Sequence, residues 1–237
     1  MDINIFLLCF NEAVLLPHTI SHYKKYLPSC KITIYDNEST DNSVEIAKEL
    51  GCSVVQWNSN NISDENIRIR IRNNVWKDCK SGWIIMADMD EFICVTEENL
   101  IEEMKSGTTI LSIKGYEMIG ESTTLDLKDI DLQQIKKYLD NPWESKKLCF
   151  LREAIVDMNY ADGSHTCIPK GIVKYSSNIY MNKHMNCLGL NFYINKITLR
   201  YERSHKMREK GWSRHYTGDV EEIKRRYTEN INKSKLL

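Results

Sequence analysis

The segment WIIMADMDEF, residues 83–92, constrains the fold more than any other part of this chain. It begins with five apolar residues, which predict a strand. Asp88 and Asp90 follow directly, with Glu91 beside them. In open α/β sheets ligands bind at the carboxyl ends of the strands, so we expect these carboxylates at a ligand site. Two carboxylates at i and i+2 can hold a divalent cation against phosphate oxygens. Acidic turns also occur as solvated caps, so the pattern needs support from the rest of the chain.

Strands and helices alternate in the first half of the chain. The continuous apolar run at 3–10 is typical of a strand buried on both faces. Such alternation predicts βαβ units and a mainly parallel sheet flanked by helices. We therefore predict an α/β, Rossmann-like fold. Further strands are expected at 31–35, 53–57, 83–87 and 109–114, and helices ending near 26 and spanning about 43–50, 64–79 and 97–104.

This alternation ends after Gly115. We find no internal repeat and no linker rich in Pro, Gly or Ser, so one domain over 1–237 is the simpler interpretation. Within it we assign 1–115 to a nucleotide-binding half and 116–237 to a smaller, mixed, acceptor-side half with C-terminal helices. In the second half we expect a helix at 132–139, strand-like pieces at 147–156 and 171–180, a helical stretch at 190–210 and a charged helix at 220–230.

Composition narrows the class of protein. The net charge of -1 over 237 residues gives no reason to expect a nucleic-acid-binding surface. None of the eight cysteines forms a C-x-x-C pair, so zinc-ribbon and thioredoxin-like sites lack their spacing, and we expect reduced thiols. No apolar run is long enough for a transmembrane segment. We predict a soluble cytoplasmic protein, with any membrane contact at its periphery, and leave the oligomeric state open.

Four segments occur along the first part of the chain in the order CFNEAVLLP, IYDNESTDNS, RNNVWK and ADMDEF. This order resembles that of nucleotide-sugar glycosyltransferases with the GT-A fold, in their family-2-like branch. The segment 184–216 is similar to that branch's C-terminal signature, which closes with Gly-Trp before His-Tyr, here ending in His215 and Tyr216. The resemblance spans Cys9 to Tyr216. It implies a hexosyl- or deoxyhexosyltransferase of glycan biosynthesis that uses a nucleotide-sugar donor, UDP-linked, and inverts the anomeric configuration.

Several residues are candidates for binding the nucleotide sugar. Asn11 and Glu12 end the first predicted strand and Asp36 ends the second, so all three are expected at one crevice. The resemblance implies that Asp36 contacts a uracil-like base; the alternative is that it builds an Asx turn. Arg72 lies where the family has a basic residue and is expected either to contact the nucleotide or its phosphates or to be a solvated helix charge.

The metal site is predicted at Asp88, Asp90 and His184. Oxygen-rich sites of this kind favour Mn²⁺ or Mg²⁺. The resemblance implies that one aspartate binds the metal while the other contacts the metal or the ribose, so Asp88 is also a nucleotide-sugar candidate. His184 matches a His-Tyr-Lys motif, but Met185 and Asn186 follow it, so one expected positive charge is missing. The transferase interpretation would fail if both aspartates pointed away from any cavity or were paired with interior arginines.

The base that activates the acceptor is expected at His165 or Asp162, in the turn-rich segment ADGSHTCIPKG. Either side chain can deprotonate a hydroxyl near neutral pH if the geometry allows it. Glu117 and Glu153 are rivals for this role. The acceptor is expected to be a glycan or glycoprotein, with a lipid-linked sugar also open.

Two other functions compete with glycosyl transfer. Haloacid-dehalogenase-like phosphatases also place Asp-x-Asp after an apolar strand, but they have Thr or Val where this chain has Phe92. A non-catalytic nucleotide-sugar-binding module would keep the fold without the reaction. The intact pair of aspartates favours an enzyme over such a module.

Overall fold

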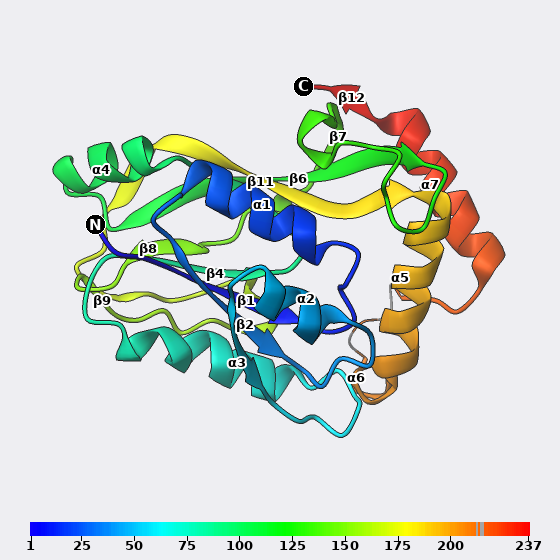
Figure 1. Cartoon of the computed structure of the whole chain (residues 1–237), viewed down its shortest axis with the longest axis horizontal. Helices are drawn as coiled ribbons and strands as arrows, with labels where there is room; N and C mark the ends of the chain where they lie inside the picture. Colours follow the sequence, from blue (N-terminus) through cyan, green and yellow to red (C-terminus); the bar gives the residue numbers. More distant parts are fainter. Residues whose placement is uncertain (212, 214–215) are drawn as a thin grey trace.

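A central sheet of ten strands runs through the molecule, with helices on both of its faces (Figure 1). The structure is a computed structural model and describes residues 1–211, 213 and 216–237. The main path of the sheet has the order β12-β7-β6-β8-β4-β1-β2-β3, and β11 joins it beside β6 and β5. The predicted α/β class, with a sheet flanked by helices, is confirmed.

Four of the five strands expected in the first half of the chain form one parallel part of the sheet. β1 lies in the centre, between β2 and β4, and all pairs are parallel. Its side chains alternate: Ile5 and Leu7 enter one hydrophobic cluster, while Phe6 and Leu8 enter a second cluster on the opposite face. The strands are β1 Ile3–Cys9, β2 Lys31–Asp36, β3 Ser53–Gln56 and β4 Trp83–Asp88.

Helices cover both faces because each presents an apolar side to the sheet. α1 (Leu16–Tyr26), α2 (Ser43–Glu49) and α4 (Glu97–Lys105) contribute to the cluster that contains Ile5 and Leu7. α3 (Glu65–Asn74) continues as the 3-10 helix η1 (Val75–Asp78) and covers the other face, where the ring of Trp76 packs on Phe150. Asp64 caps α3 by accepting hydrogen bonds from two backbone N–H groups of its first turn.

The second half extends the same sheet with two long strands. β6 (Ile110–Ser122) and β11 (Tyr175–Gly189) pair in parallel, and the shorter strands pair mostly antiparallel around them. The helix expected at 132–139 is wrong: a short 3-10 helix, η2 (Leu132–Gln134), leads into β7 (Lys137–Asp140), which pairs with β6. Tertiary pairing overrides local helix propensity here. The remaining short elements are β5 Glu91–Cys94, η3 Pro142–Glu144, β8 Cys149–Leu151, β9 Ile155–Asp157, η4 Asp162–Ser164, β10 Lys170–Gly171 and β12 Lys235–Leu236.

Three C-terminal helices follow β11: α5 (Leu190–Arg203), α6 (His205–Glu209) and α7 (Val220–Lys233). α5 and α7 pack against each other and against the ends of β6 and β11 through a third apolar cluster. α5 thereby stands at the end of the sheet where the parallel strands finish (Figure 1). In the part of the chain that is described, no helix combines the length and hydropathy needed to cross a membrane.

Candidate active site

A cavity of about 980 Å³ lies at the carboxyl ends of the parallel strands. Its inner wall is formed by residues that follow β1 and β4 together with side chains of α3, β11 and α5. Its outer wall is formed by the loops around η3 and η4. Every site residue predicted from the sequence lines it except Asp36. Those that do are Asn11, Glu12, Arg72, Asp88, Asp90, Asp162, His165 and His184.

Asp36 ends β2 below the cavity. It is fully buried, and its carboxylate accepts hydrogen bonds from the backbone N–H and the hydroxyl of Ser39, at 3.0 and 2.5 Å. Asp36 thus stabilises the turn after β2, as the structural alternative for this residue expected, although the N–H that it binds lies three residues on and not two as in an Asx turn. The neighbouring Asn37 lines the cavity in its place. Asp36 does not line the cavity, and base binding by Asp36 stays a prediction.

Asn11 and Glu12 connect the first strand to the rest of the wall. Asn11 has a positive φ of 51°, and its side-chain oxygen accepts a hydrogen bond of 2.7 Å from the Thr40 N–H, which joins the loops after β1 and β2. Asparagine tolerates this left-handed conformation better than most residues. Glu12 forms an ion pair with Lys196 at 3.0 Å. Burial raises the pKa of Glu12, and Lys196 opposes that rise.

Asp88 is held by Arg72. One guanidinium nitrogen donates to both Asp88 oxygens, at 2.7 and 3.0 Å, and the other donates to Glu65 at 3.0 Å. The Arg72 side chain is 2% exposed and that of Asp88 is 25% exposed. Burial alone would raise the pKa of Asp88, but Arg72 outweighs it and holds that pKa below its usual range. The interpretation of Arg72 as a solvated helix charge is therefore wrong, because the arginine is an interior partner of Asp88.

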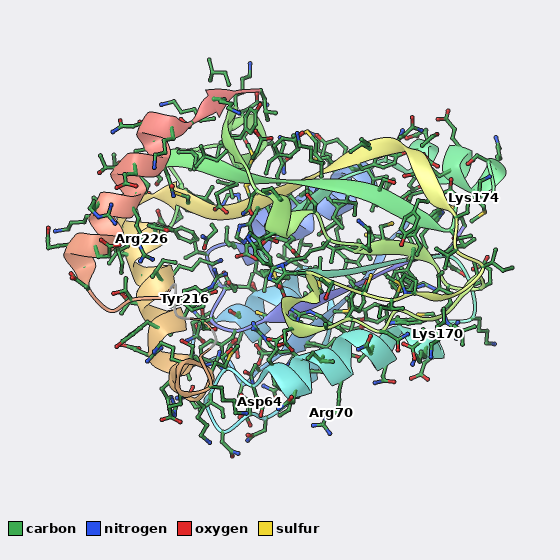
Figure 2. All side chains as sticks on the ribbon, turned by 180° about the vertical axis from the view of Figure 1, so that it is seen from behind. Asp64, Arg70, Lys170, Lys174, Tyr216 and Arg226 are labelled. Atoms are coloured by element: carbon green, nitrogen blue, oxygen red, sulfur yellow. The ribbon has the colours of Figure 1, made fainter. Side chains whose placement is uncertain are left out.

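The other arginines of α3 differ from Arg72. Arg70 is exposed and points away from the molecule (Figure 2), as expected for a solvated helix charge. Arg68 is half-buried, lines the cavity and pairs with Glu65 at 3.4 Å.

Asp90 is surrounded by cations. Its Oδ2 atom lies 2.6 Å from Arg200, 3.1 Å from Lys196 and 3.3 Å from Nε2 of His184. Burial opposes ionisation, but these three groups hold the pKa of Asp90 well below its usual value. The other ring nitrogen of His184, Nδ1, lies 2.6 Å from Glu117. Burial would lower the pKa of His184, but Glu117 and Asp90 raise it well above its usual value.

This arrangement does not fit the predicted divalent ion. Metal ligands must be deprotonated and must offer a lone pair to the ion. Both Asp88 oxygens accept from Arg72, Asp90 Oδ2 faces three cationic groups, and both nitrogens of His184 are engaged. Among the described residues, no group of three or more His, Cys, Asp or Glu side chains could hold a metal ion.

Pairing of the two aspartates with interior arginines was the condition under which the transferase interpretation would fail, and this condition is met in part. Asp88 and Asp90 do line the cavity, but each is paired with a largely buried arginine. The pair of aspartates cannot by itself carry the assignment of a transferase.

Sequence reasoning missed the basic residues of α5. Lys196, Arg200 and Arg203 lie at i, i+4 and i+7, so they share one face of the helix, and all three line the cavity. Arg203 donates to Asn37 at 2.5 Å and stacks on the ring of Phe10. We call these three residues the α5 basic stripe. The sequence shows the helical spacing of these residues, but it does not show that α5 forms part of the cavity wall.

The outer wall carries the predicted bases. Asp162 and His165 are both exposed, and His165 Nδ1 lies 2.8 Å from the carbonyl oxygen of Trp143. A carbonyl only accepts hydrogen bonds, so Nδ1 is the donor, and in the neutral ring the lone pair is then on Nε2. The rivals do not face the cavity: Glu117 lies behind His184, and Glu153 accepts a hydrogen bond from the Gly82 N–H. A general base must reach the hydroxyl, so geometry favours the outer-wall pair.

The C-terminal signature is described in part. Tyr216 and Arg226 line the cavity and lie at the α5 and α7 end of the molecule (Figure 2). Trp212 and His215 lie outside the described residues, so their expected place in the signature is not addressed by the structure.

The fold and the site together define a class: an α/β protein with a large, charged ligand cavity at the tips of its parallel strands. The family model described as "Glycosyl transferase family 2" matches residues 4–169, more than half of the chain. The chain belongs to glycosyltransferase family 2. This membership confirms the resemblance found in the sequence and leaves the phosphatase alternative without support.

Individual relatives are distant. The chain is 30% identical to Protein RfbJ of Shigella flexneri over 53 residues, which is 22% of this chain and 41% of RfbJ. A structure of S. aureus TarS 1-349 has 11% identity and a TM-score of 0.45, covering 86% of this chain and 65% of TarS 1-349. Glucosyl-3-phosphoglycerate synthase from Mycobacterium tuberculosis, in complex with Mn²⁺ and UDP, has 15% identity and a TM-score of 0.34, covering 48% and 44%. The chain thus spans less than two thirds of each of these proteins, and the likenesses are too weak to argue about the site.

Proposed function

We propose that this protein transfers a sugar from a nucleoside diphosphate sugar, UDP-linked, to an acceptor hydroxyl with inversion. Family membership supports the reaction class. The observation that carries the proposal is the α5 basic stripe, which faces a cavity at the strand tips where nucleotides bind in such sheets. A diphosphate needs positive charge at that place, and the stripe supplies it.

The donor would lie along the inner wall. Arg200 and Lys196 would exchange part of their contact with Asp90 for the diphosphate oxygens, since guanidinium groups bind phosphate with paired hydrogen bonds. Asp88, fixed by Arg72, would accept a hydrogen bond from the ribose, with Asn11 and Glu12 beside it. Because the cations are positioned before the reaction, they stabilise the negative charge that develops on the departing diphosphate.

The acceptor would approach from the outer wall. Its oxygen forms a bond with the anomeric carbon while the bond from that carbon to the diphosphate breaks. The hydroxyl proton passes to Asp162 or to Nε2 of His165. Trp143 is 71% exposed next to His165 and offers a flat apolar surface, which suits a sugar ring of a glycan or glycoprotein acceptor.

Binding of Mn²⁺ or Mg²⁺ stays a prediction, and the contacts of Asp90 make it testable. An ion at Asp90 would compete with Lys196 and Arg200 for the same oxygen. If an ion does enter there, Arg200→Met should raise the affinity for Mn²⁺, measured by calorimetry. Equal or lower affinity in the variant would place any bound ion elsewhere.

A thermal-shift panel tests the proposed donor. UDP, uridine and several UDP- and GDP-sugars would be added to the protein with Mn²⁺ and, separately, with EDTA. A ligand that binds the native state raises its stability, by about 2.7 kcal/mol at a concentration of one hundred times Kd. We expect stabilisation by UDP-sugars and UDP and little by uridine. Absence of stabilisation by every nucleoside diphosphate and sugar nucleotide in the panel would overturn the proposal.

A cytoplasmic location stays a prediction as well. The eight cysteines of the chain are all free in the structure, which suits a reducing compartment.

A further inference from the structure

One surface gathers exposed apolar side chains away from the cavity. Fourteen large hydrophobic residues of the described chain are exposed, and six of them lie between residues 156 and 179. Single exposed apolar residues are ordinary, but a concentration of this kind marks an interaction surface. The six are Val156, Ile168, Ile172, Val173, Tyr175 and Ile179, with Ile168 and Ile172 more than 70% exposed. We call the part of this surface formed by β9, β10 and the chain to Tyr175 the hairpin surface.

The members of the hairpin surface are neighbours in space. β9 and β10 pair antiparallel, with Lys170 opposite Asp157 and Gly171 opposite Ile155. The pairing continues beyond both strands, because Ile168 N–H donates to the Met158 carbonyl and Ile172 N–H donates to the Ala154 carbonyl. The exposed apolar residues therefore lie on two adjacent chain segments, and a shift of register between Lys170 and Gly171 interrupts the alternation of side chains along the second segment.

The charge of the hairpin surface has one sign. Residues 163–180 contain no Asp or Glu, and Lys170 and Lys174 alternate with isoleucines at every second position from Ile168. Both lysines are exposed and lie at the end of the molecule opposite Tyr216 and Arg226 (Figure 2). Lys147 adds a third positive charge, with its ammonium group 5.9 Å from the ring of Tyr175.

The acids behind this surface are already engaged. Asp157 on β9 pairs with Lys77 at 3.2 Å, and Glu153 accepts a hydrogen bond from the Gly82 N–H. Neither carboxylate therefore neutralises the lysines that project from the outer strand. The ammonium group of Lys174 donates a hydrogen bond to the Ser106 carbonyl, which leaves its positive charge without a carboxylate partner among these acids. The patch thus presents exposed aliphatic groups beside ammonium groups that Asp157 and Glu153 do not neutralise.

We propose that the hairpin surface docks this protein onto an anionic lipid membrane. Aliphatic side chains interleaved with lysines suit the boundary between headgroups and acyl chains. The aliphatic side chains enter the apolar layer, and the lysines meet the anionic headgroups. A protein partner matched to this surface would need acids spaced between apolar pockets, whereas a fluid anionic bilayer matches the alternation without such a fit. The proposal does not depend on the donor or the reaction.

Flotation with lipid vesicles tests the proposal. The full chain is mixed with phosphatidylcholine vesicles and with vesicles that also contain phosphatidylserine, without nucleotide. We expect flotation only with the anionic vesicles and weaker binding as salt is raised. Each lysine near such a surface contributes about 1 kcal/mol, roughly a fivefold change in affinity. Ile172→Ser combined with Lys170→Glu should therefore weaken binding at least about tenfold.

A matched variant provides the control. Val55→Ser combined with Lys48→Glu makes the same kinds of change at exposed positions on another part of the surface. It should float like the wild type. Neither pair of residues lines the cavity, so UDP binding should be unchanged in both variants, which keeps this test separate from that of the proposed function.

Three results of the flotation experiment would overturn the inference. They are no flotation with anionic vesicles, equal flotation of the hairpin variant and the wild type, or an equal loss of flotation in both double variants. A concentration-dependent dimer that Ile172→Ser with Lys170→Glu dissociates would also overturn it, since it would assign the surface to a second copy of the chain. Thermal melting of each variant verifies that flotation is compared between folded proteins.

Discussion

The two walls of the cavity are built in opposite ways. The inner wall is a network of buried carboxylates and cations in which Asp88 and Asp90 are each fixed by an arginine. The outer wall consists of short loops whose chemical groups, Asp162 and His165, are exposed and have few partners. The difference indicates a preorganised side for an anionic donor and an open side for an acceptor. Electrostatic catalysis requires this preorganisation on the side where charge develops.

Glu65 joins the two walls. Its Oε1 atom accepts hydrogen bonds from Arg72, at 3.0 Å, and from the N–H of Gly163, at 2.7 Å. The loop that carries the candidate bases is thereby tied to the arginine that holds Asp88. Loss of the Arg72 contact should therefore also affect the loop that carries the candidate bases.

The largest effect is expected from Arg72→Ala. It leaves Asp88 and Glu65 without their buried partner, which should lower the free energy of unfolding by about 3–5 kcal/mol. Arg70→Ala on the same helix is the matched control and should change it by less than about 0.5 kcal/mol, because Arg70 is exposed. Urea unfolding of both variants measures the difference. Equal effects would contradict the buried network.

Changes in the candidate bases should reduce turnover without reducing stability. The two variants are Asp162→Asn and His165→Gln. The one that removes the base should slow sugar transfer at least about a hundredfold. The free energy of unfolding should stay within about 0.5 kcal/mol, because both side chains are exposed. Release of UDP from the donor that the thermal-shift panel identifies reports the rate. Full activity of both variants would show that the base is another residue. If the wild-type protein binds the donor but shows no turnover, the result would favour the non-catalytic module.

Lys196→Met should weaken the binding of UDP about tenfold and leave that of uridine unchanged. The reason is that Lys196 lines the cavity and the proposal places it against the phosphate oxygens, not the base or ribose. Calorimetric titration of both ligands gives the comparison. Equal weakening of UDP and uridine would indicate general damage to the cavity and would count against the α5 basic stripe as the diphosphate site.

The smallest effect is expected from Gly163→Ala. Gly163 has a φ of 64°, which other residues adopt at a cost, and an added Cβ atom would approach the ring of His165 to 2.6 Å. We expect a loss of about 1 kcal/mol in the free energy of unfolding, with slower turnover and unchanged UDP affinity. Urea unfolding, the rate of UDP release and UDP titration measure these three outcomes. A large loss of UDP affinity would show that the two walls do not act separately.

Local sequence signals predicted the parallel half of the molecule well. The apolar run before Asp88 and the helical pattern of α3 are local signals, and the strand order makes Asp88 and Asp90 reach the cavity. The pairing of Arg72 with Asp88 was not predictable in the same way, because α3 and β4 must first pack before the two side chains meet.

The second half shows the limits of local patterns more clearly. The predicted helix over 132–139 gave way to β7, which forms because β6 offers it a partner. The spacing of Lys196 and Arg200 indicated a shared helix face, but no local pattern indicates that α5 closes the end of the sheet. Residues whose role depends on long-range packing were the ones that sequence reasoning missed.

Calorimetric titration of UDP and uridine into the unmodified protein tests the central claim most directly. The claim is that a nucleoside diphosphate binds against the α5 basic stripe, so the diphosphate must contribute to affinity. We predict that UDP binds at least about tenfold more tightly than uridine, a difference of about 1.4 kcal/mol, and that rising salt reduces this difference. Equal affinity for the two ligands, or no binding of UDP, would contradict it.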